Sequence, residues 1–178
     1  GMIAGVNFLT GQVHPIARIT EALHGVGALA GWDLAHAAGN IELQLHEDQV
    51  DFAAWCSYKY LNGGPGGLSG VYIHEQHAND TNRPRFGGWW GNDPSTRFKM
   101  HQIPDFHPVP SADAWQLSNP PIMALAPLRS ALTLFDEVGM PKLRSRSQRL
   151  TGWLRKQLPS WVEVMTPQDA QGAQLSLR

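Results

Sequence analysis

Short runs of apolar residues alternate with helical or glycine-rich stretches through the first half of the chain. The apolar runs predict strands at residues 6–9, 28–33, 51–56 and 70–74. A loop follows the carboxyl end of each of these strands, as in repeated strand–helix units. The pattern therefore predicts an α/β fold with a mostly parallel sheet and flanking helices.

Apolar residues recur at helical spacing in three segments. One helix is expected after Pro15, with Gly25 as its end, and a second from Pro121 to about Val138. The third is expected over residues 141–158.

The two carboxyl-terminal helices carry apolar and polar faces. In the first, we expect one apolar face to pack on the core, made of Ile122, Leu125, Leu128, Leu132 and Phe135. In the second, we expect Leu143, Leu150 and Leu154 to point inward and Arg144, Arg146, Arg149, Arg155 and Lys156 to face water. Residues 161–164 and 173–177 predict two further strands.

Composition narrows the class of protein. The 178 residues include 14 Lys+Arg and 15 Asp+Glu, so the formal charge of −1 gives no electrostatic case for nucleic acid. No apolar run reaches the roughly 18 residues that cross a bilayer, and a soluble, cytoplasmic protein without membrane partners is expected. The single cysteine, Cys56, excludes an internal disulfide and a multi-cysteine metal site. Gly1-Met2 resembles a tag remnant followed by an initiator methionine.

Lys59 is the strongest local signal for chemistry, because it follows a predicted buried strand and precedes the glycine-rich stretch 62–67. Desolvation there is expected to lower the pKa of the lysine, and an available neutral amine is what Schiff-base chemistry needs. The alternative is a lysine whose ammonium reaches water from a strand end.

Asp33 ends another apolar strand, so its carboxylate is expected at the same sheet edge as Lys59, where open α/β sheets bind ligands. A pyridinium nitrogen would be a suitable partner for such a carboxylate. The alternative is that Asp33 caps the backbone amides of the following turn.

Five segments together resemble kynureninase, within the pyridoxal-phosphate enzymes of the aspartate-aminotransferase-like, type I transferase fold. They are residues 33–40 (DLAHAAGN), 55–62 (WCSYKYLN), 88–91 (GWWG), 95–100 (STRFKM) and 118–121 (SNPP). The resemblance extends from about Val6 to about Val138 and is weaker beyond. It implies the cofactor pyridoxal 5'-phosphate and a carboxyl-terminal portion of a longer enzyme. Residues 1–138 would then be the carboxyl-terminal part of the large cofactor-binding domain, and residues 139–178 the beginning of the small α+β domain.

The resemblance also implies roles for individual residues. Lys59 would bind the cofactor as a Schiff base and move protons at the substrate α-carbon, and Asp33 would pair with the pyridinium nitrogen. His36 would support the cofactor and Asp33 from beside the ring. The remaining implied contacts are Tyr58 and Trp89 with the cofactor phosphate, Asn119 with cofactor and substrate, and Trp90 with substrate. Trp89, Trp90 and Asn119 would lie near a homodimer interface at which a neighbouring subunit completes the site.

The implied reaction is hydrolysis of the Cβ–Cγ bond of L-kynurenine or 3-hydroxy-L-kynurenine to anthranilate or 3-hydroxyanthranilate plus L-alanine, in tryptophan catabolism and NAD biosynthesis. Kynureninases are far longer than this chain, and their substrate-carboxylate arginine would lie beyond Arg178. Two alternatives stay open: an inactive fragment that keeps the fold and dimer interface, and another enzyme of this fold such as a cysteine desulfurase.

Two other functions are disfavoured. His74, His77 and Asp80, and also His101 and His107, fall in loops without a paired zinc motif, so no metal is expected. Of the tryptophans that a sugar- or peptide-binding module would use, Trp55, Trp153 and Trp161 lie in patterned segments and are expected in the core. Only the pair Trp89-Trp90 is expected to be exposed for function.

Overall fold

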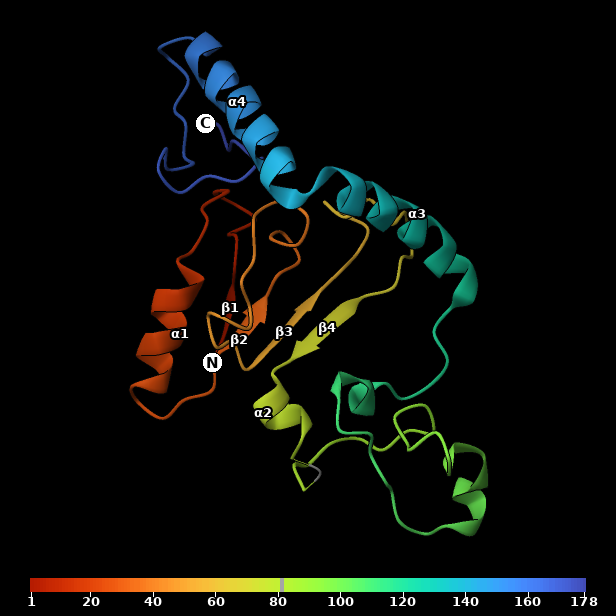
Figure 1. The fold of residues 1–178 in the computed structure, drawn as a ribbon. Coiled ribbons are helices and arrows are strands. Elements are labelled where there is room, and N and C mark those ends of the chain that lie inside the picture. Colours follow the sequence, from red (N-terminus) through yellow and green to blue (C-terminus); the bar gives the residue numbers. More distant parts are fainter. Residues whose placement is uncertain (81) are drawn as a thin grey trace.

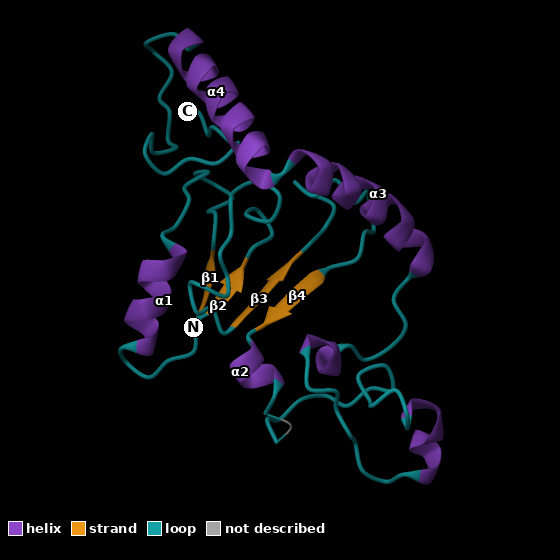
Figure 2. Cartoon of the chain, in the orientation of Figure 1, coloured by secondary structure: helices purple, strands orange, loops and turns teal. Residues whose placement is uncertain are grey.

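The computed structural model describes residues 1–80 and 82–178. Its elements, in chain order, are β1 (Met2–Ala4), α1 (Ile16–His24), β2 (Gly31–Asp33), β3 (Phe52–Trp55), β4 (Gly70–Ile73), α2 (Glu75–Ala78), the short 3-10 helices η1 (Arg97–Gln102) and η2 (Ala112–Trp115), α3 (Ile122–Val138) and α4 (Met140–Gln157). Figure 2 shows that long loops make up much of the chain between α2 and α3.

The strands form one sheet in the order β1-β2-β3-β4 (Figure 1). β1 pairs with β2 and β2 with β3 in parallel, whereas β4 runs antiparallel to β3. The predicted mostly parallel α/β sheet is therefore confirmed. One strand is displaced from its expected place: β1 ends at Ala4, and the side chain of Asn7 accepts hydrogen bonds from the backbone N–H groups of Leu9 and Thr10, which turns residues 7–10 out of the sheet.

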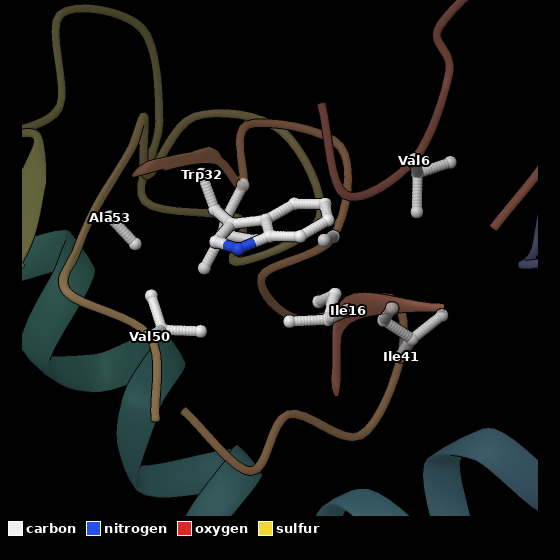
Figure 3. Packing of buried hydrophobic residues seen from close by; sticks show 8 residues of the cluster. Val6, Ile16, Trp32, Ile41, Val50 and Ala53 are labelled. Atoms are coloured by element: carbon white, nitrogen blue, oxygen red, sulfur yellow. The ribbon is translucent and has the colours of Figure 1, made fainter. Parts of the chain in front are cut away.

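The main apolar core lies between α1, β2, β3 and the turn after β2. It consists of the buried residues Val6, Ile16, Trp32, Leu34, Ala37, Ile41, Val50 and Ala53. Figure 3 shows the Trp32 indole at the centre of this cluster, and the side chain is fully buried. The indole Nε1–H is satisfied inside the core because it donates to Thr20 Oγ1 on α1 at 3.1 Å.

Thr20→Val is expected to destabilise the fold by about 1–3 kcal/mol, because the substitution keeps the shape but leaves the buried indole N–H without an acceptor. Urea unfolding followed by circular dichroism measures the loss. Thr133→Val is the matched control, since Thr133 is exposed on α3 and its change should stay within about 0.5 kcal/mol. Equal stabilities for the two variants would contradict the assignment.

The three long helices lie at the predicted places, and α1 ends before Gly25 and α3 before Gly139 as expected. The expected burial of α3 is wrong for this chain. Of its residues only Ala131 is buried, and Ile122 is 74% exposed. The side chains of Leu128, Leu132 and Phe135 instead line a largely apolar cavity of about 680 Å³, together with Trp55 and other residues beside the sheet.

The predicted faces of α4 are also partly wrong. Leu150 and Leu154 are 56% and 40% exposed, whereas two of the arginines turn toward the protein. Arg144 donates to the carbonyl oxygen of Gln171, and Arg155 donates to the carbonyl oxygen of Thr166 at 2.8 Å. Guanidinium donors thus hold residues 166–171 against α4 through backbone carbonyl oxygens.

The two strands expected near the end of the chain are absent from the described residues, where a single antiparallel bridge joins Val164 to Leu177. Backbone hydrogen bonds still join the two segments, between Glu163 and Arg178 and from the Met165 N–H to the carbonyl of Ser176. The side chain of Thr166 adds to them: its Oγ1 donates to the carbonyl of Thr10 and accepts from the backbone N–H of Ser176. The expected burial of Trp153 and Trp161 is wrong as well, because they are 62% and 82% exposed. Among the described residues, no helix combines the length and the apolar character needed to cross a membrane.

Candidate active site

The candidate site lies at the carboxyl edge shared by β2 and β3. The two strands are parallel, and Asp33 at the end of β2 is in register with Ala54 near the end of β3. The chain continues past β3 through Ser57 and Tyr58 to Lys59, so Asp33 and Lys59 stand at the same edge, as expected. The backbone N–H of Leu34 donates to the carbonyl of Ala54 at 2.8 Å and holds the turn after β2 against this edge.

Lys59 is half-buried. Its ammonium group contacts two residues that precede it in the chain, Cys56 and Tyr58. Its Nζ donates to Cys56 Sγ at 3.3 Å and lies 5.0 Å from the centre of the Tyr58 ring. The expectation of a lowered pKa is wrong. Burial does lower the pKa of Lys59, but the contacts with Cys56 and Tyr58 outweigh it, and the pKa lies above its ordinary value. The amine is therefore protonated at neutral pH until a ligand takes it up.

Asp33 is exposed. One of its carboxylate oxygens caps the turn that follows β2, as the alternative interpretation of this residue predicts. Oδ1 accepts a hydrogen bond from the backbone N–H of Ala35 at 2.9 Å. That bond fixes the direction of the carboxylate at the sheet edge. The cap occupies one oxygen, and a carboxylate offers further lone pairs to a ligand.

His36 stands close enough to Asp33 and Lys59 for both charges to act on its ring. Burial lowers the pKa of His36, the Lys59 charge lowers it further, and the Asp33 charge opposes them. The buried Nδ1 has no hydrogen-bond partner among the described residues. A neutral imidazole, with one buried ring nitrogen that makes no hydrogen bond to the described residues, thus lies near the charges of Lys59 and Asp33.

The glycine-rich segment after Lys59 packs onto Ser57. A Cβ at Gly63 or Gly67 would lie 2.7 or 2.4 Å from Ser57 Oγ, so only glycine permits this approach. The backbone N–H of Gly63 also donates to the carbonyl of Ser57 at 2.8 Å. The loop therefore holds the stretch of chain that presents Lys59. Glycine is required at positions 63 and 67 because the backbone there lies too close to Ser57 to leave room for a side chain.

Tyr58, expected to contact a cofactor phosphate, is 53% exposed at the same edge as Lys59. Trp89, Trp90 and Asn119 lie in the long loop region instead. The Trp89 and Trp90 rings meet edge to face with centroids 5.3 Å apart, and Trp90 and Asn119 line a hollow of about 430 Å³ beside β4 and η2. Among the described residues, no hydrogen bond, ion pair or aromatic contact joins these three to Lys59.

Three neighbours of the site were missed by the sequence reasoning. Phe8 and Tyr60 have ring centroids 6.2 and 6.1 Å from that of His36, and Cys56 contacts Lys59. Cys56 and Tyr60 could have been found from their adjacency to Lys59. Phe8 could not, because the strand was expected to run through it, whereas β1 ends earlier and leaves Phe8 in a loop at the same sheet edge.

Two of the histidines considered for a metal have other contacts. His77 pairs with the buried carboxylate of Asp51, and the ring of His74 stacks on His46 with centroids 5.1 Å apart. In the described part of the chain, no group of three or more His, Cys, Asp or Glu residues is arranged to hold a metal ion.

The chain is similar to kynureninases over nearly its whole length. It is 55% identical over 183 residues to the kynureninase of Myxococcus xanthus (strain DK1622), a match that covers 99% of this chain and 42% of that protein. The kynureninase of Salinispora tropica is also 55% identical, over 184 residues and the same shares. The chain thus spans less than half of the length of these relatives. Which part of them it represents, and its division after residue 138, stay predictions.

Solved structures with the same fold are more distant in sequence. An apo structure of a cysteine desulfurase from Thermococcus onnurineus NA1 superposes with a TM-score of 0.77 at 19% identity, covering 99% of this chain and 43% of that chain. A mutant of C-DES with glycine covalently linked to its PLP cofactor has a TM-score of 0.73 at 22% identity, covering 96% and 44%. These likenesses confirm the predicted fold. The family model described as aminotransferase class-V matches residues 2–176, and the chain therefore belongs to the aminotransferase class-V family.

Proposed function

We propose that this chain carries part of the active site of a kynureninase, which hydrolyses the Cβ–Cγ bond of L-kynurenine or its 3-hydroxy form to anthranilate or 3-hydroxyanthranilate and L-alanine. One observation carries the proposal: Lys59 shares a sheet edge with Asp33 and His36 in a chain 55% identical to kynureninases over 99% of its length. The place of the reaction in tryptophan catabolism is part of the same proposal.

The residues at this edge fit pyridoxal 5'-phosphate. The cofactor is an aldehyde, which an amine such as that of Lys59 can bind, and its ring nitrogen calls for a carboxylate such as that of Asp33. The buried, unpartnered Nδ1 of His36 marks a place where a polar group is still to be satisfied. When bound, the cofactor supplies an electron sink that stabilises negative charge at the substrate carbon atoms.

Each residue then has a distinct task. Lys59 would hold the cofactor through its aldehyde, and once the amine of the substrate has taken that place, the freed lysine amine would move a proton at the substrate α-carbon. Asp33 would hold the proton on the pyridine nitrogen through its carboxylate, whose direction the Ala35 N–H fixes. His36 would support the ring and Asp33 from the side without adding a second positive charge, because its pKa is lowered. Tyr58 would bind the phosphate.

A second copy of the chain completes the site in this proposal. Trp89, Trp90 and Asn119 are the residues assigned to the phosphate, the substrate and the cofactor, and within one chain none of the described contacts joins them to Lys59. We therefore assign these loops to the site of a neighbouring subunit in a homodimer.

The test begins with covalent trapping. The purified chain is mixed with pyridoxal phosphate, its visible spectrum is recorded, and the adduct is reduced with borohydride and mapped by mass spectrometry. A yellow adduct trapped at Lys59 is expected. Label scattered over Lys99, Lys142 and Lys156 would instead identify a fragment that has the fold without the cofactor site.

Turnover separates the two enzyme classes. Anthranilate fluorescence measures cleavage of kynurenine, and sulfide release measures desulfurisation of cysteine. We expect cleavage of kynurenine, by this chain or by the chain combined with the remaining part of a relative. Sulfide release without anthranilate would overturn the proposal in favour of a cysteine desulfurase.

A further inference from the structure

A buried side-chain amide joins two segments that are far apart in the sequence. Asn40 is 4% exposed, and both ends of its amide are bonded. Its Nδ2 donates to the carbonyl of His36 at 2.8 Å, and its Oδ1 accepts from the backbone N–H of Ala173 at 2.8 Å, 133 residues further along the chain. Asn40 is the last residue of the motif at positions 33–40, and the resemblance implies no role for it.

On one side, Asn40 closes the turn that carries Asp33 and His36. Gly39, with φ of +79°, brings this turn directly against the backbone of Tyr60, where a Cβ would lie 2.9 Å from the carbonyl carbon and oxygen. Tyr60 follows Lys59 in the chain and packs its ring edge to face near His36. Movement of the turn would therefore move His36 relative to Lys59.

On the other side, Asn40 meets the carboxyl-terminal segment at a point that only glycine allows. A Cβ at Gly172 would lie 2.7 Å from Asn40 Nδ2 and 2.8 Å from its Oδ1. The same segment also grips the loop after β1: Gln174 Nε2 donates to the carbonyl of Phe8 at 2.9 Å, and Ser176 Oγ donates to the carbonyl of Leu9 at 2.7 Å. Phe8 in turn lies beside the His36 ring.

We propose that Asn40 is a positioning residue that transmits the placement of residues 166–176 to His36, and through His36 to the cofactor edge at Lys59. This inference rests on the proposed function for its last step only. The contrasting explanation is that Asn40 merely ends the turn, in which case its loss would lower stability and leave the environment of His36 unchanged.

Two variants test the contact of Asn40 with residues 172 and 173, which we call the junction, and each changes one side of it. Asn40→Ala removes both hydrogen bonds, and Gly172→Ala forces the carboxyl-terminal segment away from an intact Asn40. Either variant keeps the proposal testable if the other fails to fold. Asn92→Ala is the matched control, because Asn92 is another buried asparagine, and its Oδ1 accepts from the backbone N–H of His107 at 3.1 Å, outside both segments that Asn40 joins.

The first readout needs no cofactor. The titration of the His36 imidazole is followed by NMR, and amide hydrogen exchange is measured over residues 33–40. In both junction variants we expect the pKa of His36 to rise toward its ordinary value, as burial of the ring is relaxed, and exchange in this turn to quicken. Asn92→Ala should leave both at their wild-type values. An unchanged His36 in both junction variants, with a lowered melting temperature, would overturn the proposal.

The second readout tests the last step. Both junction variants should weaken covalent uptake of pyridoxal phosphate at Lys59 by about fivefold, the factor that corresponds to losing one ordinary hydrogen bond. Shifted His36 titration with unaltered uptake would overturn transmission to Lys59. If the wild-type chain takes up no label at Lys59, the proposed function fails, and the His36 titration still decides whether Asn40 positions the turn.

Discussion

Lys59→Ala is expected to reduce pyridoxal phosphate trapped by borohydride to background, because an aldehyde can be held covalently at this edge only by the amine of Lys59. Lys59→Arg should fail equally, although it keeps the positive charge. Peptide mapping after reduction measures the trapped label. Lys99→Ala is the control, since Lys99 is exposed on η1, and it should retain full labelling. Wild-type labelling of the alanine variant would remove Lys59 from the site.

The labelling of Lys59 should also depend on pH. The aldehyde reacts with the neutral amine, and the contacts with Cys56 and Tyr58 raise the pKa of Lys59 against the effect of burial. The rate of covalent binding should therefore increase with pH through the neutral and alkaline range. Cys56→Ala should shift the rate profile toward lower pH, because it removes a contact that favours the ammonium form. A profile shifted toward higher pH would contradict this account.

Asp51→Ala is expected to lower the free energy of unfolding by about 3–5 kcal/mol, since it leaves buried donors without their common acceptor. Asp51 is 2% exposed at the start of β3, on the edge opposite Lys59. Its Oδ2 accepts from the backbone N–H of Ala30 at 2.6 Å and lies 2.8 Å from His24 Nε2, while His77 contacts Oδ1. One carboxylate thus joins three segments of the chain.

The decrease in the free energy of unfolding caused by Asp51→Ala should be larger at neutral than at acidic pH. Burial raises the pKa of Asp51, but the hydrogen bonds with His77, Ala30 and His24 together lower it below its ordinary value. A carboxyl group whose pKa is depressed by folding stabilises the fold above its unfolded pKa, about 3.9, and loses that contribution as the pH falls through the folded value. Urea unfolding should give the full difference at pH 7 and a smaller one near pH 3. Asp136→Asn, on the exposed surface of α3, should change little at either pH.

The sequence predicted best what depends on local pattern. Helix ends at Gly25 and Gly139, and the placing of Asp33 and Lys59 at one edge, follow from helical spacing, from glycine after the last turn and from parallel strand direction. The predicted pKa shift of Lys59 was wrong because a buried strand in the sequence indicates only the effect of desolvation on the lysine that follows it. The opposing contacts with Cys56 and Tyr58 depend on how the chain bends after Trp55.

Other failures have the same origin in long-range contacts. The two faces of α4 were assigned from polarity alone, yet Arg144 and Arg155 turn inward because distant carbonyl groups need donors. Phe8 and Asn40 reach the candidate site through partners that are remote in the sequence. No periodicity of apolar residues encodes such contacts.

The strand order β1-β2-β3-β4 also bears on how the chain folds. Each strand pairs with the strand that comes next in the sequence, so the sheet closes only loops of moderate length. The contacts of Ala173 with Asn40 and of Ser176 with Leu9 span 133 and 167 residues. We expect the sheet to assemble before residues 166–176 are in place, and the surroundings of His36 to reach their final form only when this segment docks.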